Sequence, residues 1–324
     1  MRLGGTARYA CEVTSEQEVL DAIDYARTHH LPIRTIGSGS NIVWRDEGFP
    51  GLLIVNKIPG FEPLEDGETV VVGAGTIWDD IVQKTVDAGL SGIEFLSLIP
   101  GTSGATPVQN VGAYGQEIRN VLLNVHAFDM HTNSFVDIPN DACAFGYRSS
   151  RFKSEDSGRF IITSITLKLN KSLPQPPFYD SLQRYLDDQG ITDYSPASIR
   201  RAVTAIRRAK LPDPAVVANN GSFFANPVIA EAEFQQLQSR FPDIKGWPVA
   251  NGVKVAAGWL VQQAGFDDRH DAETGMATWA AQNLVLVNEH AQSTQDLLTF
   301  KQKIVQAVHE TFGIVLEQEP EILP

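Results

Sequence analysis

Cysteine is nearly absent from this 324-residue chain, which contains only Cys11 and Cys143. No Cys-x-x-Cys pair occurs, so a disulfide scaffold and a zinc ribbon are excluded, and we expect two small buried side chains and no metal site. Positive charge is also scarce: 26 Lys and Arg face 39 Asp and Glu, giving a formal net charge of −13. Duplex nucleic acid is therefore not a favoured partner.

Long apolar runs are missing as well. The N-terminal stretch MRLGGTARYACEV lacks the apolar segment of a secretory signal, and no run approaches the ~20 residues of a membrane span. We therefore expect a cytoplasmic protein without a membrane partner. The balance of 43% hydrophobic and 20% charged residues is that of a globular chain, and at ~100–200 residues per domain its length allows two or three domains.

The standard nucleotide and hydrolase signatures do not occur. The chain has no Gly-x-Gly-x-x-Gly, no phosphate loop of the Walker type, no His-Glu-x-x-His and no Gly-x-Ser-x-Gly. Its seven histidines are scattered, so we do not expect a catalytic histidine.

Helix and strand signals alternate along the chain and predict an α+β fold. Ser15 and Glu18 fit a capping box, and Thr76 is placed to cap a second helix. Further helices are expected at about 196–209 and 293–312. Strands are expected at 32–36, 52–55, 70–72, 121–129, 159–169, 284–287 and 313–317.

Four glycine-rich turns lie within 80 residues: 37–41, 73–76, 101–104 and 112–115. Glycine lets the backbone approach a ligand and direct successive N–H groups at an anion. Any one of them alone reads as an ordinary tight turn, but the set of four favours a cradle for a pyrophosphate and a flat ring. Residues 91–118 are rich in glycine and weakly periodic, which indicates an ordered loop rather than a flexible linker.

Three further segments carry chemistry. Arg148 follows Phe-Gly-Tyr and is either a carboxylate-binding arginine or a surface residue. Ser222 lies between a glycine and two phenylalanines, which suits proton donation better than nucleophilic catalysis because no histidine partner is evident. Glu317, Glu319 and Glu321 share one face if the C-terminus is a strand; the alternative is a solvated acidic tail.

The segment IPGTSGATPVQNVGAYGQE, residues 99–117, closely resembles the long flavin-binding loop of the UDP-N-acetylenolpyruvoylglucosamine reductase (UDP-N-acetylmuramate dehydrogenase) family. Other segments resemble the family in the same order and cover nearly the whole chain: IGSGSNIV, VVVGAGTIWDDIV, FGYRSSRFK, KLPDP, NNGSFFANP, KVAAGWLVQQAGF, LVLVNE and FGIVLEQE. Residues 171–198 resemble an insertion found in the longer subtype.

The resemblance implies a vanillyl-alcohol-oxidase/PCMH-type FAD-binding fold with a third, substrate-binding α+β domain. The implied domains are an FAD-binding subdomain at 1–57, joined by the C-terminal segment 314–324, a second subdomain at 58–209 containing the insertion, and a substrate-binding domain at 210–313. The protein is expected to be monomeric. Family chains usually begin a few residues earlier with an Asn-Thr pair, so a short N-terminal piece is either missing here or absent by nature.

The resemblance also implies an NADPH-dependent flavoenzyme of bacterial peptidoglycan precursor synthesis. In the family NADPH reduces FAD, flavin hydride passes to C3 of the enolpyruvyl group of UDP-N-acetylglucosamine enolpyruvate, and a proton reaches C2. By motif match Ser222 is the general acid, Arg148 binds the substrate carboxylate, and Glu319 is the catalytic carboxylate. Here the usual Leu-Glu-Pro-Glu reads Leu-Glu-Gln-Glu and is followed by Pro-Glu, so Glu321 rivals Glu319 if the strand is shifted by two residues.

Ligand contacts are implied in the same way. The expected substrate contacts are Tyr147, Tyr179, Lys210, Asn226, Lys254 and Glu289. The expected FAD contacts are Gly37, Ser38, Gly39, Ser40, Asn41, Gly73, Gly75, Pro100, Gly101, Thr102, Gly104, Gln109, Asn110, Gly112, Ala113, Tyr114 and Gly115. Amides of the glycine-rich turns, with Arg148, Lys210 and Lys254, should make a positive cleft in an acidic protein. Two other hypotheses are a flavin oxidase of the same fold acting on an alcohol, and a non-catalytic nucleotide-sugar binder.

Overall fold

The computed structural model describes residues 1–323, which pack into two compact units. The N-terminal unit comprises Ala7–Ser40 and Pro50–Arg207. The C-terminal unit comprises Met1–Thr6, Asn41–Phe49 and the chain from Arg208 onward. Each unit mixes helices with sheets, as the alternation of signals predicts. The finer division into three domains stays a prediction.

A three-stranded sheet opens the N-terminal unit, in the order β1 (Ala7–Val13), β4 (Phe49–Asn56) and β2 (Ile33–Ile36). Helix α1 (Glu16–Thr28) packs on it through Val19, Ile23 and Ala26. The Ser15 hydroxyl accepts a hydrogen bond from the Glu18 amide at 3.2 Å, as the capping motif predicts. On the reciprocal side the Glu18 carboxylate accepts bonds chiefly from the amide and hydroxyl of Thr14, and the backbone of Ser15 adds a smaller contribution to the lowered pKa of Glu18.

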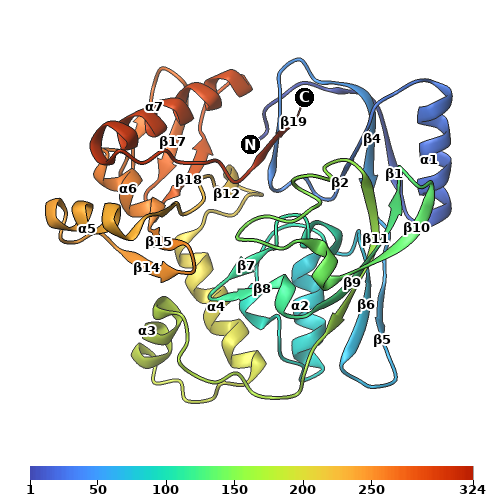
Figure 1. The fold of residues 1–324 in the computed structure, drawn as a ribbon, viewed down its shortest axis with the longest axis horizontal. Coiled ribbons are helices and arrows are strands. Elements are labelled where there is room, and N and C mark those ends of the chain that lie inside the picture. The colour runs from blue at the N-terminus through green and yellow to red at the C-terminus, as the bar shows by residue number, and fades with distance from the viewer. Residues whose placement is uncertain (324) are drawn as a thin grey trace. The chain divides into compact units, whose positions relative to one another are not determined.

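The second sheet of this unit is antiparallel throughout (Figure 1). Helix α2 (Trp78–Asp87) packs against it through Trp78, Ile81 and Val82, none of which is exposed. Thr76 does not cap this helix, because its hydroxyl bonds to the backbone of Gly60. The strand order is β10 (Ser134–Pro139), β9 (Leu122–Asp129), β11 (Phe160–Lys168), β6 (Thr69–Gly73) and β5 (Phe61–Pro63).

Residues 91–118 form the predicted ordered loop, built from short 3₁₀ turns at Glu94–Leu96 and Ser103–Ala105 and from a hairpin of β7 (Gly112–Ala113) and β8 (Gln116–Glu117). Further 3₁₀ turns follow at Ile118–Asn120 and Asn140–Cys143. The predicted insertion contains helix α3 (Asp180–Asp188) and leads into α4 (Pro196–Lys210). These two helices share a small core of their own, which includes Phe178, Leu182, Leu186, Ile199, Val203 and Ile206.

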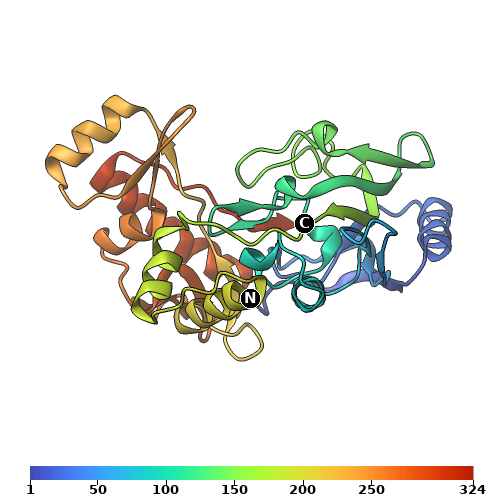
Figure 2. The same cartoon turned by 90° about the horizontal axis from the view of Figure 1, so that it is seen from below.

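The C-terminal unit has a main sheet in the order β12 (Ala218–Ser222), β18 (Gln282–Asn288), β17 (Met276–Trp279) and β16 (His270–Asp271). Helices α6 (Ala257–Gln263) and α7 (Thr294–Phe312) bury one face of it, through a core that includes Leu260, Met276, Leu286 and Phe300. A smaller sheet, in the order β13 (Val228–Ile229), β15 (Gly252–Val255) and β14 (Gly246–Val249), lies beside α5 (Glu231–Arg240) (Figure 2).

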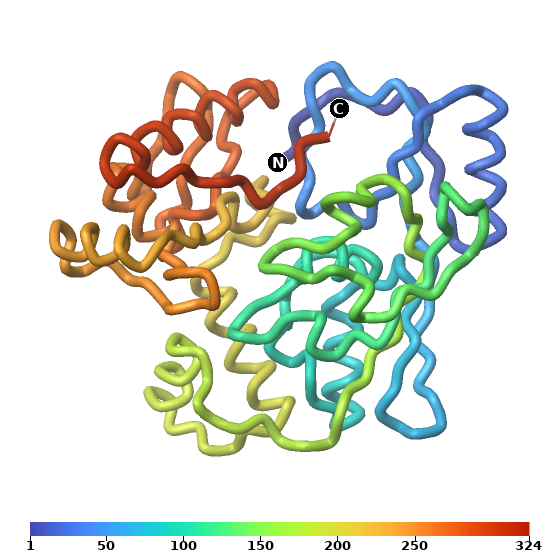
Figure 3. The backbone as a smooth tube through the Cα atoms, viewed as in Figure 1, coloured from blue at the N-terminus to red at the C-terminus, as the bar shows by residue number. Residues whose placement is uncertain are grey.

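The C-terminal segment runs back along α7 after Gly313 (Figure 3). Gly313 takes the left-handed conformation, with φ of 76°, and ends the helix as a C-cap. The strand predicted at 313–317 is therefore wrong: Ile314 and Leu316 are buried, but the strand, β19, lies at Glu321–Leu323 and pairs in parallel with β3 (Ile42–Trp44). No helix within residues 1–323 is both long and apolar enough to cross a membrane.

Candidate active site

Three of the four glycine-rich turns meet in the N-terminal unit. The Ser40 hydroxyl donates to the carbonyl of Pro100 at 3.2 Å, which joins the first turn to the third. The third turn is joined to the second through the amide of Gly104, which donates to the carbonyl of Ala74 at 2.9 Å. The Ser103 hydroxyl, buried between them, donates to the carbonyl of Gly73. Turns that are 60 residues apart in sequence thus form one cluster.

In the turn at 73–76 both glycine amides are already hydrogen-bonded to carbonyls of the protein. The Gly73 amide donates to the carbonyl of Gly60 at 3.1 Å, and the Gly75 amide donates to that of Ile58 at 2.8 Å. A Cβ on Gly75 would collide with the backbone of Lys57. Gly73 and Gly75 therefore allow their backbone to pack closely against residues 57–60. If they contact a ligand, they do so by van der Waals contact and not by donating N–H groups.

The turn at 37–41 is different. Within residues 1–323 the amides of Gly37, Ser38 and Gly39 donate to no protein acceptor. The hydroxyl of Thr102 is buried beside Gly37 and has no hydrogen-bond partner among the described residues, and a Cβ on Gly37 would collide with it. Buried polar groups are normally bonded, so each unpaired one needs an explanation. A run of unpaired amides beside an unpaired hydroxyl is what a bound phosphate-containing cofactor would satisfy.

The fourth turn meets the segment that carries Arg148. Asn110, which is fully buried with φ of 47°, donates to the carbonyl of Gly146 at 2.9 Å and to the carboxylate of Glu117 at 3.0 Å. The Arg148 guanidinium donates to the carbonyl of Gly112 at 2.7 Å and lies 5.2 Å from the ring centre of Tyr147. Asn110 thus orders the loop, and the loop in turn orders Arg148. Gln109 is half-buried beside Asn110.

A cation that no sequence motif indicates lies near this turn. Arg207, on α4, donates to the carbonyl of Leu98 at 3.3 Å and has no carboxylate within ion-pair distance among the described residues. Burial lowers the pKa of its guanidinium, and the nearby phenol of Tyr114 opposes that shift. The run IRRAVTAIRRAK, residues 199–210, gave too weak a signal, because its arginines are equivalent in sequence. In the structure Arg200 pairs with Asp79 and Arg207 does not.

Two predicted tyrosines contact each other in the same unit. The rings of Tyr114 and Tyr179 meet edge to face with centres 6.0 Å apart, although 65 residues separate them in sequence. Burial raises the pKa of both phenols. The insertion therefore brings Tyr179 to the hairpin turn of the flavin-type loop, where Tyr114 and Gly115 take positive φ values of 50° and 85°.

Ser222 ends β12 in the C-terminal unit. Gly221 precedes it in the left-handed conformation, with φ of 71°, and the Phe223 amide that follows donates to the carbonyl of Leu284 at 2.7 Å. The rings of Phe223 and Phe224 are buried and pack edge to face at 5.4 Å. The half-buried Ser222 hydroxyl has no hydrogen-bond partner in the described part of the chain. The backbone thus presents this hydroxyl beside an apolar wall, as its sequence context indicates.

The C-terminal segment runs antiparallel to the Ser222 segment. The Glu319 amide donates to the carbonyl of Phe223 at 2.8 Å, and the Ala225 amide donates to that of Glu317 at 3.0 Å. Glu321 lies further along, in β19, where its amide donates to the carbonyl of Asn41 at 3.0 Å. In the observed register Glu319, not Glu321, therefore lies next to the residue that follows Ser222.

The remaining predicted substrate residues of this unit lie in different places. The side-chain oxygen of Asn226 accepts from the Ala257 amide at 2.9 Å, and Lys254 lies opposite Val228 and Trp247 in the small sheet. Lys210 is exposed at the end of α4.

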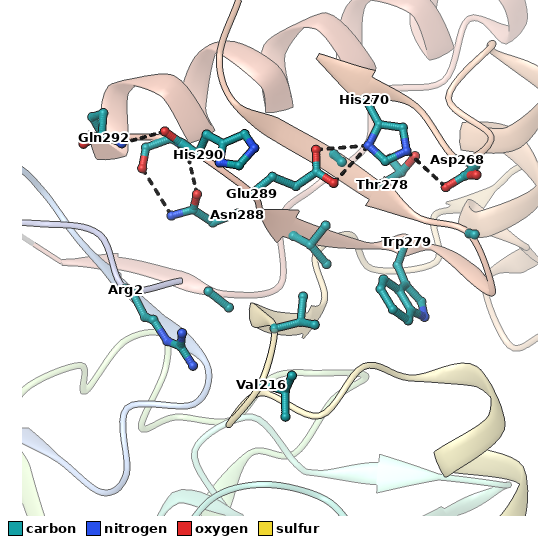
Figure 4. Close-up of a pocket in the computed structure, with 16 residues that line it drawn as sticks. Arg2, Val216, Asp268, His270, Thr278, Trp279, Asn288, Glu289, His290 and Gln292 are labelled. Atoms are coloured by element: carbon teal, nitrogen blue, oxygen red, sulfur yellow. Dashed lines mark hydrogen bonds and ion pairs between the residues drawn. The ribbon is translucent and has the colours of Figure 1, made fainter. Parts of the chain in front are cut away.

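Glu289 lies apart from these residues. Its carboxylate bonds to Nδ1 of His270 at 2.9 Å, in a pocket of about 630 Å³ that Arg2, Val216 and Trp279 also line (Figure 4). The pocket lining includes neither Lys210, Asn226 nor Lys254.

The two cysteines are free, and burial raises the pKa of the Cys143 thiol to about 11, so this thiol is inert. Cys11 is only partly buried, which departs from the expectation of two buried side chains. Within residues 1–323 no group of three or more His, Cys, Asp or Glu side chains could hold a metal ion.

Comparisons with known proteins give matches over both units. Residues 7–134 match an FAD binding domain, and residues 213–323 match the C-terminal domain of UDP-N-acetylenolpyruvoylglucosamine reductase. The relatives include a UDP-N-acetylenolpyruvoylglucosamine reductase from Ralstonia nicotianae, which is 40% identical over 99% of this chain and 95% of its own length. The reductase from Alcanivorax borkumensis is 42% identical over 90% of this chain and 84% of its own length.

A solved reductase from Thermus caldophilus is 23% identical, covers 97% of this chain and 92% of its own, and superposes with a TM-score of 0.67. These matches confirm the predicted α+β FAD-binding fold with a further C-terminal domain. The chain belongs to the UDP-N-acetylenolpyruvoylglucosamine reductase family.

Proposed function

We propose that this chain is a flavoenzyme that uses NADPH to reduce UDP-N-acetylglucosamine enolpyruvate to UDP-N-acetylmuramate. Family membership supports the reaction. The observation that carries the proposal is the pairing of the Ser222 segment with the Glu319 segment: a hydroxyl with no partner among residues 1–323 and a carboxyl-bearing residue occupy adjacent backbone positions beside a buried aromatic wall. A proton donor and a carboxylate in a dry setting are the requirements of acid–base chemistry.

The N-terminal unit fits FAD. The amides of Gly37, Ser38 and Gly39 and the unpaired Thr102 hydroxyl would hold its phosphates, because they are donors without a protein acceptor. Gly73, Gly75 and Gly104 would shape the surface by close packing. Bound there, FAD would supply the redox chemistry of the reaction, which is hydride transfer from NADPH to C3 of the enolpyruvyl group. The other predicted contacts are Ser40, Asn41, Pro100, Gly101, Gln109, Asn110, Gly112, Ala113, Tyr114 and Gly115.

The chain's own residues then handle charge and protons. Arg148 would bind the substrate carboxylate and stabilise the negative charge that develops next to C2, because its guanidinium is fixed at one edge by the carbonyl of Gly112. Ser222 would donate the proton to C2 from its Oγ. Glu319, whose amide is bonded to the carbonyl of Phe223, would be the catalytic carboxylate next to this proton donor.

Cations and tyrosines would bind the nucleotide end. Lys210, Asn226 and Lys254 are the predicted partners of the uridine diphosphate, with Tyr147 and Tyr179 alongside. We add Arg207, because a half-buried guanidinium without a carboxylate partner suits a diphosphate oxygen. Glu289 stays a predicted contact, although its carboxylate is bonded to His270. The enzyme is proposed to be monomeric and cytoplasmic; sedimentation of the FAD-loaded protein would test the first of these.

The decisive experiment follows the flavin spectrum under anaerobic conditions. NADPH alone should bleach the yellow FAD-loaded protein, and addition of UDP-N-acetylglucosamine enolpyruvate should restore the colour in one turnover. Recovery on addition of oxygen but not of the enolpyruvyl sugar would overturn the proposal in favour of an oxidase. Binding of uridine nucleotides by a protein that takes up no FAD would overturn it in favour of a non-catalytic binder.

A further inference from the structure

The C-terminal segment contains three candidate carboxylates where the reaction needs one. Glu317, Glu319 and Glu321 alternate with Gln318 and Pro320. Residues two apart on an extended chain share a face, so a shift of two residues would exchange Glu319 for Glu321 without turning the face away. Backbone bonds such as that from the Glu319 amide to the Phe223 carbonyl would re-form with Glu321 in its place. They do not select one glutamate.

A side-chain contact does distinguish the two. Lys301, on α7, donates from Nζ to the side-chain oxygen of Gln318 at 2.6 Å, and the side-chain Nε2 of Gln318 donates to the carbonyl of Pro320 at 2.9 Å. These two bonds fix the bend between Glu319 and Glu321 from the helix side. Buried Leu316 and Leu323 anchor the segment at either end, and Gln318 is the residue that ties its middle to α7.

The environment of Lys301 gives this contact its strength. Lys301 is half-buried, and burial lowers the pKa of its ammonium. Within residues 1–323 no carboxylate lies within ion-pair distance of it, so the Gln318 oxygen is its acceptor. A shift of two residues would bring Pro320 opposite Lys301. A proline side chain accepts no hydrogen bond, so the half-buried ammonium would lose its acceptor.

We propose that Lys301 and Gln318 are positioning residues that hold Glu319, rather than Glu321, beside Ser222. The inference rests on the proposed function, since it assigns a role within that reaction. It also accounts for a departure from the family motif. Where that motif has the proline of Leu-Glu-Pro-Glu, this sequence has Gln318, and α7 supplies Lys301, which binds it.

The test asks which glutamate the reaction depends on. In the FAD-loaded wild type, Glu319→Gln should lower kcat by roughly 100-fold or more and Glu321→Gln should change it little. In a Lys301→Met background the loss caused by Glu319→Gln should shrink by about tenfold and that caused by Glu321→Gln should grow. Gln318→Leu should behave like Lys301→Met, whereas Gln318→Glu, which keeps an acceptor, should retain dependence on Glu319.

A matched control lies two residues along the same helix. Lys303 pairs with Asp271 and Glu273, away from Gln318, so Lys303→Met should leave the dependence on Glu319 unchanged. A second readout does not use turnover: hydrogen exchange of the Glu319 amide in the FAD-loaded protein should speed up in Lys301→Met and Gln318→Leu but not in Lys303→Met.

Additive effects of Lys301→Met and Glu319→Gln, with unchanged exchange of the Glu319 amide, would overturn this inference while leaving the proposed function intact. A wild type that bleaches with NADPH but does not respond to the enolpyruvyl sugar would instead overturn the proposed function. The two failures are therefore distinguishable.

Discussion

Glycine serves opposite purposes in the glycine-rich turns of the N-terminal unit and at Gly221 of the C-terminal unit. In the N-terminal unit Gly37 and Gly75 allow close approach: a side chain at either would collide with the protein itself. In the C-terminal unit Gly221 has open space around the position of a Cβ, and what it contributes is the left-handed backbone that turns Ser222 outward. One region works through main-chain groups and shape, and the other presents a single side chain. The two should therefore respond to substitution in different half-reactions.

The largest effect is expected where one side chain carries the chemistry. Ser222→Ala should lower the rate of substrate reduction by roughly 10²–10⁴, the usual contribution of a positioned general acid. Flavin reduction by NADPH should stay nearly normal, because the hydroxyl takes no part in it. Stopped-flow measurement of the two half-reactions separates these outcomes, and near-normal turnover by Ser222→Ala would remove Ser222 from the role of proton donor.

In the N-terminal unit a comparably large effect should come from shape. Gly75→Ala drives a Cβ into the backbone of Lys57, which cannot move aside as a side chain can, so we expect a loss of about 1–3 kcal/mol in the free energy of unfolding. Gly115→Ala is the contrasting control: its φ of 85° is positive, unlike that of Gly75, and nothing lies within contact distance of the new Cβ. Urea unfolding of both variants tests this. A smaller loss in Gly75→Ala than in Gly115→Ala would show that the backbone of Lys57 yields to the new Cβ and that the collision does not set the cost.

A smaller effect of opposite sign is expected at Thr102. Its buried hydroxyl lacks a partner in the described chain, and an unpaired buried polar group costs about 1–3 kcal/mol. Thr102→Val should therefore raise the stability of the FAD-free protein and weaken FAD binding at the same time. Unfolding of the FAD-free protein and titration with FAD measure the two quantities. A variant that loses stability and binds FAD normally would show that the hydroxyl does not face the cofactor.

The contrast between the regions also explains which features the sequence predicts. Periodicity locates α7 at 294–312 within a residue of expectation, because its buried face repeats every turn from Leu297 to Phe312. The Gly-rich motifs locate the loops. Sequence alone does not tell Gly37 from Gly75, because the amide of Gly75 is already bonded to the carbonyl of Ile58, 17 residues earlier in the chain, and that of Gly37 is not bonded within the described chain. Nor does it tell Arg207 from Arg200, because Asp79, which pairs with Arg200, comes from another helix.

The C-terminus shows the same limit. The apolar run Ile314-Val315-Leu316 predicts a strand. Its pattern instead reflects a segment in which Ile314 and Leu316 are buried and Val315 is exposed. The hydrogen-bonded strand forms further along, at β19, because β3 is there to pair with it. Pairing partners remote in sequence decide where an extended segment becomes a strand. The choice between Glu319 and Glu321 likewise depends on Lys301, which is 17 residues from Gln318 and carries no motif.

The smallest effect is expected in the pocket of the C-terminal unit that holds Glu289. The Glu289 carboxylate and, more weakly, Asp268 raise the pKa of His270 above its ordinary value. A histidine whose pKa is higher in the folded state contributes stability below its unfolded pKa, and that contribution disappears as pH rises through the folded pKa. Because His270 is exposed, solvent screens the pair and the change in stability should be slight. Glu289→Gln should return the pKa of His270 toward the ordinary ~6.5, which NMR titration of its ring protons measures. The same substitution should leave the loss of activity caused by Ser222→Ala unaltered. A large fall in affinity for the uridine nucleotide in Glu289→Gln would instead restore Glu289 to the substrate site and place this pocket within it.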